Sequence, residues 1–217
     1  MNKFSVIMTV YDQGAELEAN LPAFLTQEYE PGYEVIVIDE SSTDDTPDIL
    51  KLFKNDYKHL YTTFLPKSNA QICHRKLAFN IGIKASKYEY IIITKISSPP
   101  THTDVIKAMS EVLDTNAQLT LGYVTKKHIC LQPFDTIAEA EGHILRSERR
   151  ITKVRERQYG NYTCGRYDFI IIKKDNTFDL LKLFEQKLSA GRLFSIRLGI
   201  LWKNLCRRSS TTLLVTE

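Results

Sequence analysis

The sequence predicts a single α/β domain whose central sheet is mostly parallel and is flanked by helices. Short apolar runs typical of buried strands alternate with helical stretches through the first 125 residues. Such alternation produces β-α-β units, which place helices on both faces of a parallel sheet. The chain has 217 residues, enough for one domain of this kind but too few for two full-sized ones. No internal repeat or low-complexity linker divides it.

Each expected strand is a short run rich in β-branched and aromatic residues, as strands buried on both faces are. The expected helices carry apolar residues at helical spacing, and polar or turn-forming residues separate them from the strands. The expected strands are 4–10, 33–38, 59–65, 90–94, 118–124 and 167–173. The expected helices are 15–26, 49–53, 72–86, 103–113, 136–154 and 179–190.

Polar residues follow several of the expected strands. Thr9 and Tyr11 stand at the end of the first strand, Asp39 opens a polar loop after the second, and residues 94–98 follow the fourth. In an open parallel sheet, ligands bind at the carboxyl ends of the strands. The sequence therefore predicts a ligand site formed by these loops.

Several other kinds of site are not supported. No G-x-G-x-x-G follows the first strand, and the glycines at 160 and 165 lack the Lys-Ser/Thr pair of a phosphate loop and precede a strand. The four cysteines form no C-x-x-C pair, so neither a zinc site nor a small disulfide framework is expected. A formal net charge of +3 argues neither for nor against a nucleic-acid partner.

Five segments together resemble the inverting, family-two glycosyltransferases. They are the strand 4–11, the residues Leu25-Thr26-Gln27, the strand and loop 35–44 ending in D-E-S-S-T-D, the helix 74–84, and the strand 90–94. The family shows a strand ending in a polar-aromatic pair and then a strand ending in a D-[DE]-x-S-x-D loop. The segments occur in the family's order and spacing, and the resemblance covers roughly residues 4–125.

The resemblance implies a glycosyltransferase-A fold with a nucleotide-diphosphate-sugar site at the carboxyl edge of the sheet. By matching position, Thr9 and Tyr11 would line the base pocket, and Asp39 would accept the imide N–H of uracil or thymine. Arg75 would approach the base or the diphosphate, so the implied donor is UDP- or dTDP-linked. Each residue also has a plainer interpretation: Asp39 as a helix cap, Tyr11 as a packing aromatic, and Arg75 as a solvated helix residue.

The sequence departs from the family at the end of the fourth strand. The family places there an Asp-x-Asp that holds Mg²⁺ or Mn²⁺, whereas this chain reads Lys95-Ile96-Ser97. We therefore expect no metal cofactor. Either the Lys95 ammonium replaces the metal beside the diphosphate, or the site is inactive.

The catalytic base is also changed. Inverting transferases use a carboxylate to deprotonate the acceptor hydroxyl, and the family places it in a Glu-Asp pair. The nearest match is Glu185, followed by Gln186 in place of the aspartate. The Q-x-x-R-W motif of processive members is absent, so polymer synthesis is not expected.

The later part of the chain has a different composition. We expect one domain over 1–208, made of a nucleotide-binding half, 1–125, and an acceptor-side half, 126–208, before a loose tail, 209–217. Residues 192–208 combine Trp and Leu with Arg and Lys, which suits either a helix on an anionic membrane surface or one packed on the core. Acidic residues are mixed into the basic cluster at 146–157, which argues against a nucleic-acid surface.

The predicted activity is transfer of a sugar, with inversion, from a pyrimidine-nucleotide donor to a saccharide or lipid-linked acceptor. The expected location is the cytoplasm, with possible peripheral contact at the inner membrane face. One alternative is an inactive homologue that binds a nucleotide sugar or a partner enzyme. The other is a non-enzymatic membrane-surface module.

Overall fold

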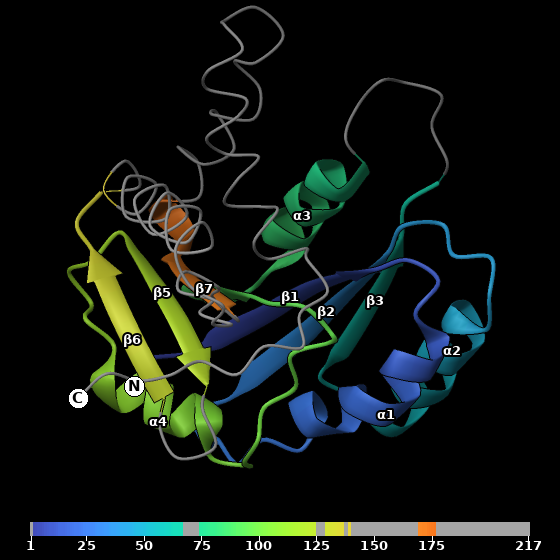
Figure 1. The fold of residues 1–217 in the computed structure, drawn as a ribbon, viewed down its shortest axis with the longest axis horizontal. Coiled ribbons are helices and arrows are strands. Elements are labelled where there is room, and N and C mark those ends of the chain that lie inside the picture. Colours follow the sequence, from blue (N-terminus) through green and yellow to red (C-terminus); the bar gives the residue numbers. More distant parts are fainter. Residues whose placement is uncertain (1, 67–73, 125–128, 137–138, 140–168, 177–217) are drawn as a thin grey trace, which may run out of the picture.

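The computed structural model describes residues 2–66, 74–124, 129–136, 139 and 169–176. These residues form one seven-stranded sheet with helices on both faces (Figure 1). The strands are β1 Phe4–Val10, β2 Tyr33–Asp39, β3 Leu60–Phe64, β4 Tyr90–Ile93, β5 Leu119–Val124, β6 Ile129–Phe134 and β7 Phe169–Lys173. The helices are α1 Gly14–Leu25, α2 Thr46–Asp56, α3 His74–Ala85 and α4 Val105–Val112, with a 3₁₀ turn, η1, at Lys174–Asn176.

The sheet has the order β3-β2-β1-β4-β7-β5-β6. The first four strands in this order are mutually parallel, as the β-α-β alternation predicted. β7 is antiparallel to both β4 and β5, and β6 is antiparallel to β5. The sheet is therefore parallel from β3 to β4 and antiparallel from β4 to β6.

The expected elements up to residue 124 are all present, with small shifts at their ends. β1 has the predicted bounds, and α2 is longer than predicted because it begins at Thr46. The sequence pattern did not predict β6, which forms an antiparallel hairpin with β5. Most of the helix expected at 136–154, and all of those expected at 179–190 and 192–208, lie outside the described residues.

Two apolar layers enclose the sheet. α3 packs on one face, whereas α1, α2 and α4 cover the other (Figure 1). All seven residues of β1 are buried, with Ile7 facing the α3 layer and Val6 and Met8 facing the opposite layer. Because both faces are covered, the strand sequence is a nearly continuous apolar run and lacks the alternation of a half-exposed strand.

Gly82 allows α3 to lie close to the parallel strands. A Cβ built on Gly82 would lie 2.6 Å from Cγ2 of Ile7 and 2.8 Å from Cδ1 of Ile38. Both neighbours are buried branched side chains of the core, so neither can move freely to make room. The glycine is therefore required by the spacing between this helix and the sheet.

We expect Gly82→Ala to lower the free energy of unfolding by about 1–3 kcal/mol, because the added methyl overpacks the core. The gain in helix propensity of up to ~1 kcal/mol offsets only part of this cost. Denaturant unfolding measures the change, and Lys84→Ala, at an exposed position of the same helix, is the matched control. A Gly82→Ala protein as stable as the wild type would show that the helix can shift outward without loss.

Tyr33, the first residue of β2, is a buried tyrosine whose hydroxyl oxygen accepts the backbone N–H of Gln27 at 3.0 Å. Burial raises the pKa of this hydroxyl to about 12. The folded protein thus keeps a proton that the unfolded chain releases near pH ~10. This contribution to stability is complete below pH ~10 and is lost as the pH rises towards 12.

We expect Tyr33→Phe to flatten the alkaline decline in stability between pH ~10 and 12, because the group responsible for much of it is gone. Burial also raises the pKa of Tyr90, so some decline remains. At neutral pH the variant should be less stable by about 1 kcal/mol, since the Gln27 N–H loses its acceptor. Denaturant unfolding at pH 8 and pH 11 tests both effects, and an unchanged alkaline slope would contradict this assignment.

Candidate functional site

The carboxyl ends of β1 and β2 lie side by side. The two strands pair in parallel up to Val10 and Asp39, and the N–H of Glu40 donates to the Val10 carbonyl at 2.9 Å. Thr9 and Tyr11 flank Val10, so the structure brings both of them to the same edge as Asp39. Three of the residues predicted for the base pocket are thus gathered there.

Asp39 is a buried carboxylate, only 3% exposed, at the end of β2. Its Oδ1 accepts two hydrogen bonds from Ser42, one from the backbone N–H at 2.9 Å and one from the hydroxyl at 2.6 Å. Among the described residues, no hydrogen bond to Oδ2 is found. Asp39 does not cap α2, because that helix begins at Thr46 and Asp39 bonds to the loop before it. One carboxylate oxygen is therefore fixed by the protein and the other can accept a ligand donor.

Tyr11 is 46% exposed and stands directly after β1. The residue that follows, Asp12, has a left-handed backbone with φ of 49°. Aspartate tolerates this conformation better than most side chains, because its short carboxylate can bond to nearby backbone groups.

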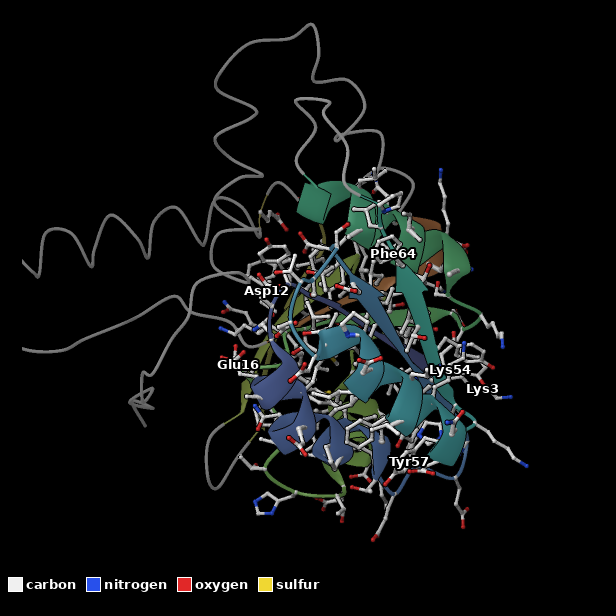
Figure 2. The ribbon with its side chains drawn as sticks, turned by 90° about the vertical axis from the view of Figure 1, so that its right-hand side faces the viewer. Lys3, Asp12, Glu16, Lys54, Tyr57 and Phe64 are labelled. Atoms are coloured by element: carbon white, nitrogen blue, oxygen red, sulfur yellow. The ribbon has the colours of Figure 1, made fainter. Side chains whose placement is uncertain are left out.

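The loops after β1 and β2 are joined by a cluster of hydrogen bonds that we call the loop clasp, formed by Asp12, Ser42 and Thr43. Asp12 Oδ1 accepts the N–H of Thr43 at 2.6 Å and its hydroxyl at 3.3 Å. In return, the N–H of Asp12 donates to the Ser42 hydroxyl at 3.0 Å. Asp12 lies at the left side of the coloured ribbon in Figure 2. Sequence reasoning missed this cluster, although a polar residue after a strand and a Ser-Thr-Asp run are typical of such side chain–backbone bonds.

A second set of bonds ties the same two loops at the start of α1. The N–H of Gly14 donates to Oδ2 of Asp44 at 2.9 Å, and the N–H of Gln13 donates to the Thr46 hydroxyl at 3.1 Å. A small loss of hydration acts to raise the pKa of the exposed Asp44, but hydrogen bonds from Thr46 and from the Gly14 N–H outweigh it and lower the pKa below its ordinary value. The carboxylate form is thus the one that fits this junction, consistent with anions being favoured near a helix N-terminus.

The end of β4 reaches the same edge, because the N–H of Thr94 donates to the carbonyl of Ile7 in β1 at 3.0 Å. Beyond it Lys95 is half-buried, Ile96 is fully buried and Ser97 is half-buried. The chain turns here, with the Ser98 N–H donating to the Lys95 carbonyl at 3.0 Å. The structure therefore places Lys95 on the loop that follows the strand next to β1.

The residues after β4 do not fit the divalent cation that the family norm implies. Mg²⁺ and Mn²⁺ take hard oxygen ligands, chiefly carboxylates. Lys95 supplies a positive charge, the Ile96 side chain is apolar, and Ser97 supplies a single hydroxyl. Within the described part of the chain, no three His, Cys, Asp or Glu side chains are grouped so as to hold a metal ion.

For the other predicted site residues, the structure describes little or nothing. Arg75 belongs to the first turn of α3, and its side chain lies outside what the structure describes. Glu185 and residues 192–208 also lie outside the described residues. The described helices include none long and apolar enough to cross a membrane.

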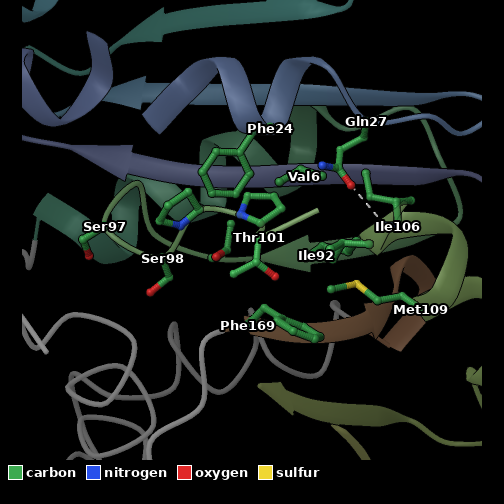
Figure 3. A pocket seen from close by; sticks show the side chains of 14 residues that line it. Val6, Phe24, Gln27, Ile92, Ser97, Ser98, Thr101, Ile106, Met109 and Phe169 are labelled. Atoms are coloured by element: carbon green, nitrogen blue, oxygen red, sulfur yellow. Dashed lines mark hydrogen bonds between the residues drawn. The ribbon is translucent and has the colours of Figure 1, made fainter. Parts of the chain in front are cut away.

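A separate cavity of about 190 Å³ lies beneath the chain segment that follows β4, between the sheet and α1 (Figure 3). Phe24, Met109 and Phe169 line it, and none of its described lining residues is charged. The amide of Gln27 is already used, donating to the carbonyls of Ala23 and His102 and accepting the N–H of Ile106. Such a cavity does not suit a diphosphate, so the polar edge around Asp39 is the candidate site.

Comparisons with known proteins agree with this architecture. Residues 5–94 match the model of the glycosyl transferase family 2. The chain is 26% identical over 128 residues to a hyaluronan synthase of Pasteurella multocida, a match covering 58% of this chain and 13% of that protein. It is 27% identical over 116 residues to the uncharacterized glycosyltransferase YibD of Escherichia coli K12, covering 54% of this chain and 30% of that protein.

Among solved structures, the mannosyltransferase PcManGT of Pyrobaculum calidifontis, in complex with GDP-Man and Mn²⁺, is similar in fold. The TM-score is 0.55 at 18% identity, and the match covers 82% of this chain and 46% of that one. The fold is therefore of the glycosyltransferase-A type. The family model matches residues 5–94, and the chain spans less than a third of either curated relative.

Proposed function

We propose that the protein is a glycosyltransferase that moves a sugar from a pyrimidine-nucleotide donor, UDP- or dTDP-linked, to a saccharide or lipid-linked acceptor. The family match over residues 5–94 and the glycosyltransferase-A fold support a transferase with a nucleotide-sugar donor. The finer assignment of the base depends on the residues at the carboxyl edge of β1 and β2.

The observation that carries the proposal is the environment of Asp39. A buried carboxylate is costly unless it is hydrogen-bonded, and Ser42 satisfies only Oδ1. Oδ2 can accept the imide N–H of uracil or thymine in a charge-assisted hydrogen bond. The exposed ring of Tyr11, one residue beyond the strand position paired with Asp39, offers a flat surface for the base.

The diphosphate would lie near Lys95, on the loop after β4. A lysine ammonium is a compact point charge that can balance a developing negative charge without a metal. In the reaction, the acceptor hydroxyl oxygen bonds to the anomeric carbon as the bond from that carbon to the diphosphate oxygen breaks. Glu185 would take the acceptor's proton, and Lys95 would stabilise the charge left on the departing nucleotide.

The donor assignment is tested by calorimetric titration with UDP, with and without Mn²⁺, on wild type and Asp39→Ala. We expect binding without metal, weakened about 10- to 100-fold in Asp39→Ala, because a hydrogen bond to a charged group is lost. GDP is the informative comparison, since guanine also carries a ring N–H but is a larger base. Equal UDP affinity in the two proteins, or a clear preference for GDP, would contradict the pyrimidine assignment.

The role of Lys95 is tested by release of UDP from a panel of UDP-sugars. We expect turnover to survive EDTA and to fall by about 10²–10³-fold in Lys95→Ala, since a group that balances transition-state charge is removed. Lys95→Arg keeps the charge in a different geometry and should retain part of the activity. Activity abolished by EDTA would overturn the metal-independent mechanism.

A second candidate function is favoured by the replacement of the Asp-x-Asp by Lys95-Ile96-Ser97. In this case the protein is an inactive relative that binds a nucleotide sugar or a partner enzyme. UDP binding that depends on Asp39, with no turnover of any sugar in the panel, would support this alternative over the transferase.

A further inference from the structure

We infer that the loop clasp fixes Tyr11 and Asp39 in place before a nucleotide binds, so that Asp12 and Ser42 are positioning residues of the donor site. The inference rests on the proposed function, since it assumes that these two residues receive the base. It adds residues that would contact no part of the donor and act only through their neighbours.

Ser42 is the centre of the clasp. Its hydroxyl donates to Asp39 Oδ1 at 2.6 Å and accepts the N–H of Asp12 at 3.0 Å, while its own N–H donates to the same Oδ1 at 2.9 Å. Two donors on one oxygen restrict rotation of the carboxylate and so determine where Oδ2 lies. The same hydroxyl ties that carboxylate to the loop that carries Tyr11.

Asp12 anchors the backbone on the carboxyl-terminal side of Tyr11. Its carboxylate accepts two hydrogen bonds from Thr43, and its backbone is left-handed, with φ of 49°. On the preceding side, Val10 is anchored to the sheet, and its carbonyl accepts the N–H of Glu40 at 2.9 Å. The backbone of Tyr11 is therefore tethered at both neighbouring residues, although the residue as a whole is 46% exposed.

This arrangement lowers the cost of binding. A ligand that must order a loop and select one rotamer of a carboxylate loses part of its interaction energy to that ordering. When the protein's own hydrogen bonds have already fixed both groups, more of the interaction energy appears as affinity. The affinity for the nucleotide should thus depend on side chains that never touch it.

Two pairs of variants separate positioning from simple folding. Ser42→Ala removes the bridging hydroxyl, whereas Ser42→Thr retains one. Asp12→Gly permits the left-handed backbone but removes the carboxylate, whereas Asp12→Asn permits this backbone and keeps an oxygen acceptor for Thr43. Ser110→Ala, which removes a hydroxyl bonded to Tyr29 at 3.0 Å far from the clasp in sequence, is the matched control.

We expect Ser42→Ala and Asp12→Gly to weaken UDP binding about five- to tenfold, measured by calorimetry well below the melting temperature. Ser42→Thr, Asp12→Asn and Ser110→Ala should stay within about twofold of the wild type. Hydrogen exchange of the nucleotide-free protein supplies a second readout: the Asp12 amide should exchange faster in Ser42→Ala, and the Thr43 amide faster in Asp12→Gly.

The possible outcomes are distinct. Faster exchange with unchanged UDP affinity would show that the clasp is structural only and would overturn the positioning role. Unprotected Asp12 and Thr43 amides in the wild type would show that the clasp does not form. Wild-type protein that does not bind UDP would overturn the proposed donor, and the positioning role with it, whereas a loss confined to Ser42→Ala and Asp12→Gly supports both.

Discussion

The parallel pairing of β1 with β2 is the constraint on which the rest of the structure depends. Its register sets Val10 against Asp39, and this places the exposed Tyr11 next to a buried carboxylate. A slip of one residue would turn every side chain of β1 to the opposite face, so that Ile7 would leave the α3 layer against which it packs. Because both faces of β1 are covered, this register is strongly favoured, and the geometry of the edge follows from burial of the core.

The polar edge at the carboxyl ends of the strands carries charged groups of both signs. Asp39 and Asp44 are carboxylates held by hydroxyl groups and backbone N–H donors of the loops themselves. Lys95 instead comes from the loop after β4, and that strand pairs with β1 on the side opposite β2. The edge thus has carboxylates on one side and a cation on the other.

The antiparallel strands join the later part of the chain to the parallel strands of the sheet. β7 lies between β4 and β5, although it comes after both in the sequence. A Cβ built on Gly122 of β5 would lie 2.1 Å from the ring of Phe169 in β7, so only glycine leaves room for that ring. Phe169 also lines the apolar cavity beneath the segment after β4. Phe169, the first residue of β7, therefore packs directly against β5, which comes much earlier in the chain.

The sequence by itself determined the strands and helices up to residue 124, the parallel arrangement of the first four strands, and the position of Asp39 and Tyr11 at strand ends. These follow from local periodicity and from the rule that the carboxyl ends of parallel strands share an edge. Only the tertiary structure revealed the insertion of β7, the hairpin of β6, the need for Gly82, and the clasp of Asp12, Ser42 and Thr43. Apart from the β6 hairpin, whose strands are neighbours in the chain, these features depend on contacts between residues far apart in the sequence. No local pattern encodes such contacts, because strand order and loop-to-loop hydrogen bonds are decided by packing around the whole sheet.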